Sequence, residues 1–306
     1  PVDSGKSTLC RILVNYAVRM GFEPILVDLD IGQGNITCPG NIAACSIQGP
    51  VDVEEGYPLE NPLVYYYGHL TPSMNPDHYK CIVKCMGEVL DKRAQKNPEE
   101  SAAGMIINTM GWIDGLGYDI LLDTIEKMRA GTVLVVGNEK LYSQLSSHYE
   151  DSSVEVVRLK QSGGVVSRPQ ELRQESRVQR VKEYFYGIRR ELAPHSQTIP
   201  IADLKGRIYR VGGGPKAPTS ALPIGATSIA DPLRVMPVTP DNSMLHCLLA
   251  VSRAEKPEHL LSANIAGFIY VSDIDLSSQK LTYLAPCPGS LPGRLLLAGS
   301  FKCYFE

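Results

Sequence analysis

The sequence predicts an α/β domain, with a mostly parallel β-sheet and helices on both of its faces, followed by a smaller, mainly β domain. In the first part of the 306-residue chain, short apolar runs typical of buried parallel strands alternate with amphipathic helical patterns. After about Leu192, Pro and Gly recur, helical periodicity fades and short alternating runs appear. We therefore expect a first domain over residues 1–192 and a second over residues 193–306.

The elements of the first domain are recognised by their apolar patterns. Leu9, Ile12, Leu13 and Tyr16 recur at helical spacing and predict a helix over residues 7–20. The Gly- and Pro-rich stretch that follows the first strand is expected to form a loop with at most one short strand. Further apolar runs predict buried strands at residues 24–30, 62–68, 103–111 and 132–137, and helical patterns cover residues 78–95 and 116–128.

Short alternating runs define the expected second domain. Such runs indicate strands that each bury one face, and several of them in succession are typical of a mainly β domain. They fall at residues 206–212, 233–238, 266–275, 280–286 and 295–301.

The chain opens with "PVDSGKST", which is the second half of a phosphate-binding loop. Gly5, Lys6 and Ser7 match the end of the G-x-x-x-x-G-K-[ST] signature, and the first glycine would precede Pro1. Such a loop also follows a β-strand, so we expect a further region before Pro1. Backbone N–H groups of the loop and of the helix N-terminus would bind phosphate oxygens, which indicates the P-loop NTPase type of fold. The residues expected to bind ATP are Asp3, Ser4, Gly5, Lys6, Ser7 and Thr8.

Two acidic residues end the strand after this helix, in "VDLDIGQG". Asp28 and Asp30 are two positions apart, so on a strand they point to the same face, at the edge where ligands bind in this architecture. One carboxylate could hold Mg²⁺, together with the hydroxyl of Ser7, and the other could accept the proton of an attacking hydroxyl. The alternative is that both acids simply cap the end of a strand.

The segment "NTMGW" brings further polar and aromatic groups to the same edge. Asn108 and Thr109 end an apolar strand, and Trp112, the single Trp of the chain, follows Gly111 on a loop. An aromatic ring in this place could be a stacking platform for a nucleic-acid base. A Trp buried between domains fits the spacing equally well.

Arginines accumulate between residues 161 and 191. Arg168 and Arg173 follow the glycines of "QSGGVV", which are suited to a hinge. Because arginine binds phosphate in a bidentate manner, the segment is expected to be a mobile lid that closes over the nucleotide and neutralises developing charge. A solvated helix face with ion pairs is the alternative interpretation.

Composition excludes several classes of function. A net charge of −3 and a pI of about 6.1 give no overall attraction to nucleic acid, so such binding requires a local basic patch. No apolar run approaches the length of a membrane span, which is about 18 residues. The eight cysteines form no C-x-x-C pair and no zinc pattern, and they suit a reducing intracellular compartment.

Taken together, these segments resemble one family. "DSGKST", "VDLDIGQG", "NTMGW", "SGGVVSR" and "EYFYG" are similar to segments of the polynucleotide 5′-hydroxyl kinases associated with the eukaryotic pre-mRNA cleavage and polyadenylation complex and with tRNA splicing. The resemblance continues through "LPIG", "MPVTP" and "AGFIYV" to the end of the chain. It implies a nuclear kinase that transfers the γ-phosphate of ATP, with Mg²⁺, to the 5′-OH of RNA, and that associates with cleavage-complex subunits and the tRNA-splicing endonuclease.

The resemblance also assigns roles to residues. Lys6 and Ser7 would hold phosphates and Mg²⁺, and Asp30 would activate the RNA 5′-hydroxyl, which leaves Asp28 as the acid for the metal. Trp112 would clasp the terminal nucleotides with Gln33 nearby, and Arg168 and Arg173 would act from the lid.

Three other functions stay open beside an active RNA kinase. The first is an ATP-bound scaffold without catalysis, although Gly5, Lys6, Ser7, Asp30 and Trp112 are all intact. The others are a switch-type P-loop ATPase and a small-molecule kinase. Switch-type ATPases with a deviant phosphate loop carry an additional Lys roughly where Pro1 stands, and its absence here argues against them. The sequence leaves the choice between RNA and DNA open.

Overall fold

The structure is a computed structural model that describes residues 1–54, 56–57, 61–213 and 231–304. The chain forms two compact units, each made of two stretches: unit 1 is Pro1–Leu63 with Val83–Arg177, and unit 2 is Val64–Ile82 with Val178–Glu306. These units are defined by contacts in space and each combines two separate stretches of sequence, so they do not test a boundary between consecutive domains. The predicted boundary between residues 192 and 193 stays a prediction. The "LPIG" segment lies outside the described residues.

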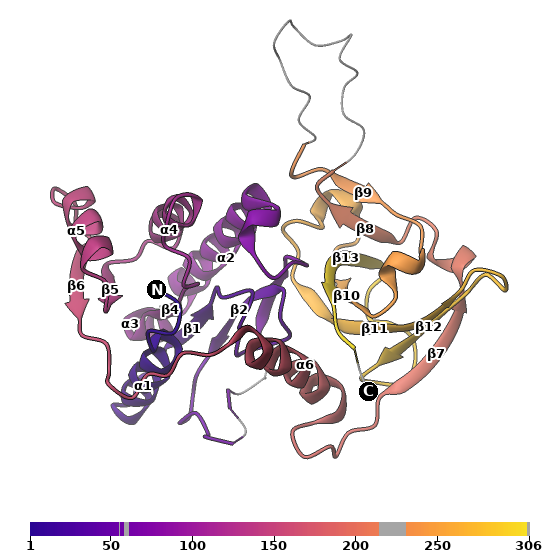
Figure 1. The fold of residues 1–306 in the computed structure, drawn as a ribbon, viewed down its shortest axis with the longest axis horizontal. Coiled ribbons are helices and arrows are strands. Elements are labelled where there is room, and N and C mark those ends of the chain that lie inside the picture. Colours follow the sequence, from indigo (N-terminus) through magenta and orange to yellow (C-terminus); the bar gives the residue numbers. More distant parts are fainter. Residues whose placement is uncertain (55, 58–60, 214–230, 305–306) are drawn as a thin grey trace, which may run out of the picture. The chain divides into compact units, whose positions relative to one another are not determined.

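The chain as far as residue 186 combines strands and helices, which alternate strictly only from β4 onward (Figure 1). All four predicted strands and all three clear helical patterns of this part are present, with ends that differ by a few residues. The elements are α1 (Lys6–Arg19), β1 (Ile25–Asp28), β2 (Asn41–Ser46), β3 (Leu63–Tyr66), α2 (Pro76–Lys96), α3 (Pro98–Ala103), β4 (Met105–Asn108), α4 (Leu116–Lys127), β5 (Thr132–Val136), α5 (Glu139–His148), β6 (Glu155–Leu159) and α6 (Gln170–Tyr186).

A four-stranded sheet with the order β3-β2-β1-β4 carries the residues of interest. β1 pairs in parallel with β4, with Asp28 opposite Asn108, and β2 pairs antiparallel on the other side of β1. β5 and β6 form a separate parallel pair. All four residues of β1 are buried, whereas the first three of β4 are half-buried, because β4 is the last strand at its end of the sheet.

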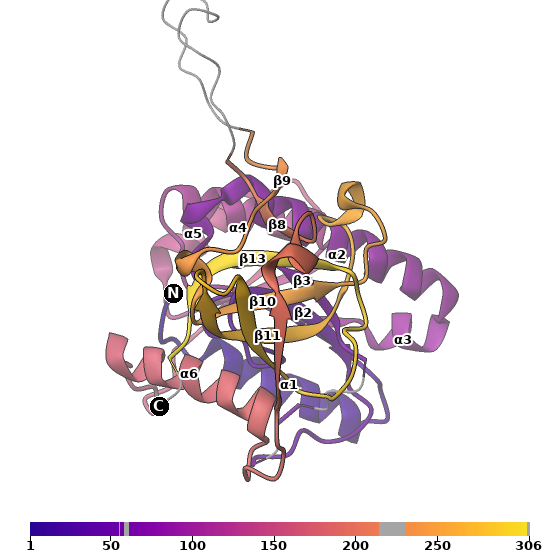
Figure 2. The same ribbon diagram turned by 90° about the vertical axis from the view of Figure 1, so that its right-hand side faces the viewer.

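Unit 2 contains a seven-stranded sheet with the order β7-β12-β11-β10-β13-β8-β9. Its strands β8, β9, β10, β11 and β13 are labelled in Figure 2. Its pairs are antiparallel except for β8 with β13. The mainly β character predicted for the C-terminal part is therefore confirmed. The strands are β7 (His195–Pro200), β8 (Ile208–Val211), β9 (Val235–Pro237), β10 (Cys247–Ser252), β11 (Ile265–Asp275), β12 (Lys280–Ala285) and β13 (Leu295–Lys302), and short 3₁₀ turns lie at Pro72–Met74, Ile201–Leu204, Asn242–Met244 and Pro257–His259.

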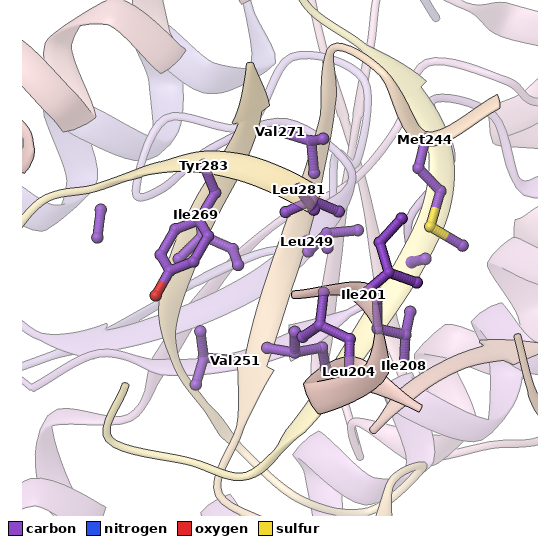
Figure 3. Close-up of a cluster of buried hydrophobic side chains, with 13 residues drawn as sticks. Ile201, Leu204, Ile208, Met244, Leu249, Val251, Ile269, Val271, Leu281 and Tyr283 are labelled. Atoms are coloured by element: carbon purple, nitrogen blue, oxygen red, sulfur yellow. The ribbon is translucent and has the colours of Figure 1, made fainter. Parts of the chain in front are cut away.

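The core of this sheet shows the two-residue period of β-strands. Side chains two positions apart on neighbouring strands point into one cluster (Figure 3). Met244 and the buried residues Ile201 and Leu204 of a 3₁₀ turn belong to the same cluster. The paired positions are Leu249 and Val251 on β10, Ile269 and Val271 on β11, and Leu281 and Tyr283 on β12.

Candidate nucleotide and phosphoryl-transfer site

The phosphate loop is preformed at the N-terminus of α1. Gly5 is the N-cap residue and has φ 87°, a left-handed conformation that glycine adopts without strain. The buried Ser4 donates a hydrogen bond from Oγ to the carbonyl of Pro1 (2.9 Å), and the ammonium of Lys6 donates to the same carbonyl. The loop thus directs backbone N–H groups and the positive end of a helix to one place, which is an anion site. Thr8 is exposed on the first turn of α1.

Asp28 lies at the end of β1 and is buried. Its Oδ1 accepts hydrogen bonds from the backbone of Asp30 (3.1 Å) and from Nδ2 of Asn108 (3.0 Å), and its Oδ2 accepts from the backbone of Asn35 (2.7 Å). Burial and the neighbouring charge of Asp30 raise the pKa of Asp28 to about 6, although these hydrogen bonds oppose the rise.

Asn108 connects this carboxylate to the phosphate loop. Its Oδ1 lies 3.4 Å from Oγ of Ser7, while its Nδ2 donates to Asp28. From the sequence, Asn108 was expected at this edge, but no role in the site was predicted for it. The sequence signal that could have indicated this role is a polar residue at the end of an apolar strand.

Asp30 lies beyond the end of β1, in the turn that follows it. The prediction that Asp28 and Asp30 lie on one face of the same strand is therefore wrong, because the strand ends at Asp28. Oδ1 of Asp30 accepts hydrogen bonds from the backbone of Gly32 and of Gln33, both at 3.0 Å. Burial raises the pKa of Asp30, and these two hydrogen bonds and the charge of Lys6 oppose the rise.

Lys6 is electrostatically coupled to both acidic regions of the site. Burial lowers the pKa of its ammonium, while the charges of Asp30 and then Asp3 raise it. Lys6 and Asp30 are thus close enough to interact, as a phosphate-binding cation and a nearby proton acceptor must be.

The predicted lid arginines reach the phosphate loop, and both pair with Asp3. Nη2 of Arg173 lies 2.6 Å from Oδ2 of Asp3, and Nε of Arg168 lies 3.5 Å from Oδ1. Gln33 also contacts this segment, through Nε2 and the carbonyl of Arg173 (3.4 Å). The side chain of Asp3 as the partner of both arginines was not foreseen, because it depends on residues some 165 to 170 positions away.

Trp112 follows β4 in the loop before α4 and is half-buried. Its ring packs against Gly117, where an added Cβ would lie 2.6 Å from Cγ of the indole. One side of the ring thus has a backbone contact, while part of the side chain stays accessible. This placement is compatible both with stacking and with a structural role, so the assignment stays a prediction.

Within the described part of the chain, no helix is both long and apolar enough to cross a bilayer. The same residues contain no cluster of three or more His, Cys, Asp or Glu side chains that could hold a metal. A metal at this site would therefore depend on hydroxyl, water and phosphate oxygens as well as carboxylates.

Comparisons with known proteins agree with this fold. Residues 1–187 match the family described as "mRNA cleavage and polyadenylation factor CLP1 P-loop", and residues 192–305 match "Pre-mRNA cleavage complex II protein Clp1". A solved structure of a wild-type Clp1p–Pcf11p complex superposes with a TM-score of 0.81 over 99% of this chain and 73% of that one, at 21% identity. This likeness confirms the predicted fold class.

Relatives are similar over nearly the whole chain. "Protein CLP1 homolog" from Arabidopsis thaliana is 52% identical over 302 residues, which are 98% of this chain and 68% of the relative. "Polyribonucleotide 5'-hydroxyl-kinase Clp1" from Bos taurus is 43% identical over 298 residues, 97% of this chain and 69% of that protein. The chain spans about two thirds of the length of such relatives. With both family regions matched and the phosphate loop, Asp28 and Asp30 at one sheet edge, the chain belongs to the Clp1 family.

Proposed function

We propose that this protein transfers the γ-phosphate of ATP to the 5′-hydroxyl of RNA. The observation that carries the proposal is a preformed phosphate loop with Lys6 at the N-terminus of α1, beside a half-buried carboxylate, Asp30, whose Oδ1 is held by two backbone N–H groups after β1. Relatives that are 42–43% identical bear the name polyribonucleotide 5'-hydroxyl-kinase. The same chemistry was expected from the sequence.

In this mechanism ATP binds with its phosphates on the loop from Asp3 to Thr8. Lys6 neutralises charge on the β- and γ-phosphates, and the arginines Arg168 and Arg173 do so from the lid as charge develops. Asp30 accepts the proton of the attacking 5′-hydroxyl. Two backbone N–H groups hold Oδ1 of Asp30, which fixes the carboxylate in place.

The residues present fit Mg²⁺. Ser7 has a hydroxyl at the first turn of α1, and its contact with Asn108 is long, at 3.4 Å. Both oxygens of Asp28 already accept hydrogen bonds, so Asp28 would act through water, a mode that Mg²⁺ favours. When bound, Mg²⁺ would neutralise charge on the phosphate oxygens.

Trp112 and Gln33 are assigned to the RNA end. The backbone N–H of Gln33 donates to Oδ1 of Asp30, and its side-chain Nε2 contacts the backbone of the lid segment, so Gln33 lies between the proposed proton acceptor and the lid. The half-buried ring of Trp112 would stack on a terminal base.

The wider setting of this activity is also a proposal. Membership of the Clp1 family supports a role in mRNA 3′-end processing, with cleavage-complex subunits as partners. A nuclear location rests on the family resemblance of the sequence. Two solved structures similar to this chain are of Clp1p with Pcf11p. A role in tRNA splicing, with the tRNA-splicing endonuclease as partner, rests on the family resemblance of the sequence.

A transfer assay tests the proposal directly. The complete protein is incubated with Mg²⁺, γ-labelled ATP and an RNA oligonucleotide that carries either a 5′-OH or, as a control, a 5′-phosphate. We expect label on the 5′-OH RNA alone, and loss of labelling in Asp30→Asn with ATP binding retained, since the amide has no basic oxygen. ATP binding without labelling of RNA would instead indicate a scaffold.

A further inference from the structure

Asp3 contacts the lid segment through both its side chain and its backbone. Its Oδ2 accepts hydrogen bonds from the backbone N–H of Arg168 (2.9 Å) and from Nη2 of Arg173 (2.6 Å). Its carbonyl accepts a third from Nε2 of Gln161 (3.2 Å). One residue of the phosphate loop therefore contacts the lid segment on both sides of Gly163 and Gly164.

The position of Asp3 is specialised. Its φ is 48°, which is uncommon for a residue other than glycine, and its side chain is only 10% exposed. Oδ1 is buried and accepts no hydrogen bond from the described residues; Nε of Arg168 lies 3.5 Å away. Because this carboxylate is largely removed from water, its negative charge needs the positive charges of Arg168 and Arg173 beside it.

The arginines depend on Asp3 in turn. Lys6, Arg168 and Arg173 bring three positive charges to one small region, and Arg168 disfavours the charged form of Lys6 while Asp3 favours it. Without the carboxylate these cations would repel one another until a nucleotide bound. The side chain of Val165 also packs on Gly5, where an added Cβ would lie 3.2 Å from Cγ2 of Val165, so the segment and the loop are in contact.

We propose that Asp3 is a positioning residue, whose carboxylate holds Arg168 and Arg173 beside the phosphate loop so that they meet the transferring phosphoryl group. The proposal rests on the proposed kinase function. It assigns to the side chain of Asp3 a task separate from the backbone contacts of the loop with phosphate.

The first test is Asp3→Asn in the complete protein, with steady-state kinetics on ATP and 5′-OH RNA. Misplaced arginines weaken binding of the transition state rather than of ATP, so kcat should fall about tenfold or more while KM for ATP changes less than about threefold. Glu139→Gln is the matched control, because it removes an exposed carboxylate from an ion pair with Arg158 (2.7 Å) outside the site. An unchanged or higher kcat in Asp3→Asn would overturn the proposal.

A double-mutant cycle tests whether Asp3 acts through Arg173. If it does, Asp3→Asn should lower kcat by a clearly smaller factor in an Arg173→Gln background than in the wild type, because one of the two arginines that it positions is already absent. Equal effects in both backgrounds would show that Asp3 acts independently of Arg173.

Hydrogen exchange gives a readout that does not depend on activity. The amides of residues 161–168 should exchange faster in Asp3→Asn, with the melting temperature nearly unchanged, and Asp3→Glu provides a milder variant if the first folds poorly. Unchanged exchange in both variants would contradict the anchoring role. If the wild-type protein labels no RNA, the proposed function fails, and the exchange experiment still decides whether Asp3 holds the segment.

Discussion

Asn108 bridges Asp28 and Ser7, with Nδ2 donating to Oδ1 of the carboxylate at 3.0 Å and Oδ1 at 3.4 Å from the serine hydroxyl. Both Asp28 and Asn108 are buried, and they are register partners on the parallel strands β1 and β4. The position of the acid relative to the phosphate loop therefore depends on pairing between two strands.

Asn108→Ala should destabilise the protein by about 1–3 kcal/mol, because it removes a buried hydrogen bond to a carboxylate. Urea unfolding of the variant and the wild type measures the difference. Asn35→Ala is the matched control: its side chain lies 3.5 Å from Asp28, and its stronger backbone contact at 2.7 Å survives the substitution. Equal costs for both variants would argue against a special role for Asn108.

Asp28 should make stability depend on pH. Its pKa is about 6 in the folded protein, against an ordinary value of 3.8 for an aspartate, so between these values the folded state binds more protons than the unfolded state. Unfolding free energy attributable to Asp28 should therefore fall as pH rises from about 4 to about 6, by about 3 kcal/mol in total for a shift of about two units.

The measurement is unfolding by urea at several pH values for wild type and Asp28→Asn. The variant should show a flatter profile in this window, and the difference between the two profiles reports Asp28 together with its electrostatic coupling to Asp30. A wild-type profile that parallels the variant would mean that Asp28 titrates near its ordinary value.

Lys6→Ala should reduce phosphorylation of 5′-OH RNA by about 10²- to 10³-fold, because the lost charge acts on the phosphoryl group in a largely water-excluded site. Single-turnover labelling provides the rate. Lys140→Ala, which removes an exposed cation paired with Asp114, is the control and should label RNA at the wild-type rate. Comparable rates in the two variants would exclude this loop as the catalytic one.

Trp112→Ala separates the two interpretations of the indole. As a stacking platform the ring contributes about 1–3 kcal/mol per base, so RNA binding should weaken by about one to two factors of ten with little change in melting temperature. As a core residue it would cost about 3–5 kcal/mol of stability. The placement of the ring on Gly117 allows either outcome. The family resemblance of the sequence predicts the first, and Trp112→Phe should then retain much of the binding.

Binding of a fluorescent 5′-OH RNA and thermal unfolding, measured on the same preparations, distinguish these cases. An unstable Trp112→Ala protein whose folded fraction binds RNA normally would defeat the stacking assignment.

Local patterns in the sequence were enough to predict much of the fold. The run Ile25–Asp28 is apolar and fully buried, and the phosphate loop and its helix lie within one continuous segment. β7 was missed because its alternation is largely polar and exposed, so it depends on a neighbouring strand that the local pattern does not contain. β10 was missed although its run of buried apolar residues is the same kind of signal that predicts β1.

The site was predictable to the extent that its residues are close in sequence. Lys6, Ser7, Asp28 and Asp30 were named from two short motifs. The pairing of Asp3 with Arg173 joins residues 170 positions apart, and the bridge from Asn108 to Ser7 joins residues 101 apart. Such contacts follow from packing of the whole unit, which no local pattern encodes.

The interleaving of the two units has a consequence for synthesis on the ribosome. In unit 2, the backbone N–H of Val64 donates to Oδ1 of Asn264 (2.8 Å), and the hydroxyl of Tyr66 donates to the carbonyl of Leu248 (3.0 Å). These partners are 200 and 182 residues apart. At about 5–20 residues per second, translation separates the first pair by roughly 10–40 s.

During that interval residues 64–82 have none of these partners, although apolar side chains such as Val64 and Tyr65 are buried in the finished fold. Unit 2 can complete its packing only after β13 has been synthesised, because β10 pairs with it. β3 can pair with β2 as soon as both are synthesised, but the packing of residues 64–82 within unit 2 waits for the end of translation. Truncated products that stop near residue 192 would leave the surface that packs in unit 2 exposed to chaperones and to aggregation.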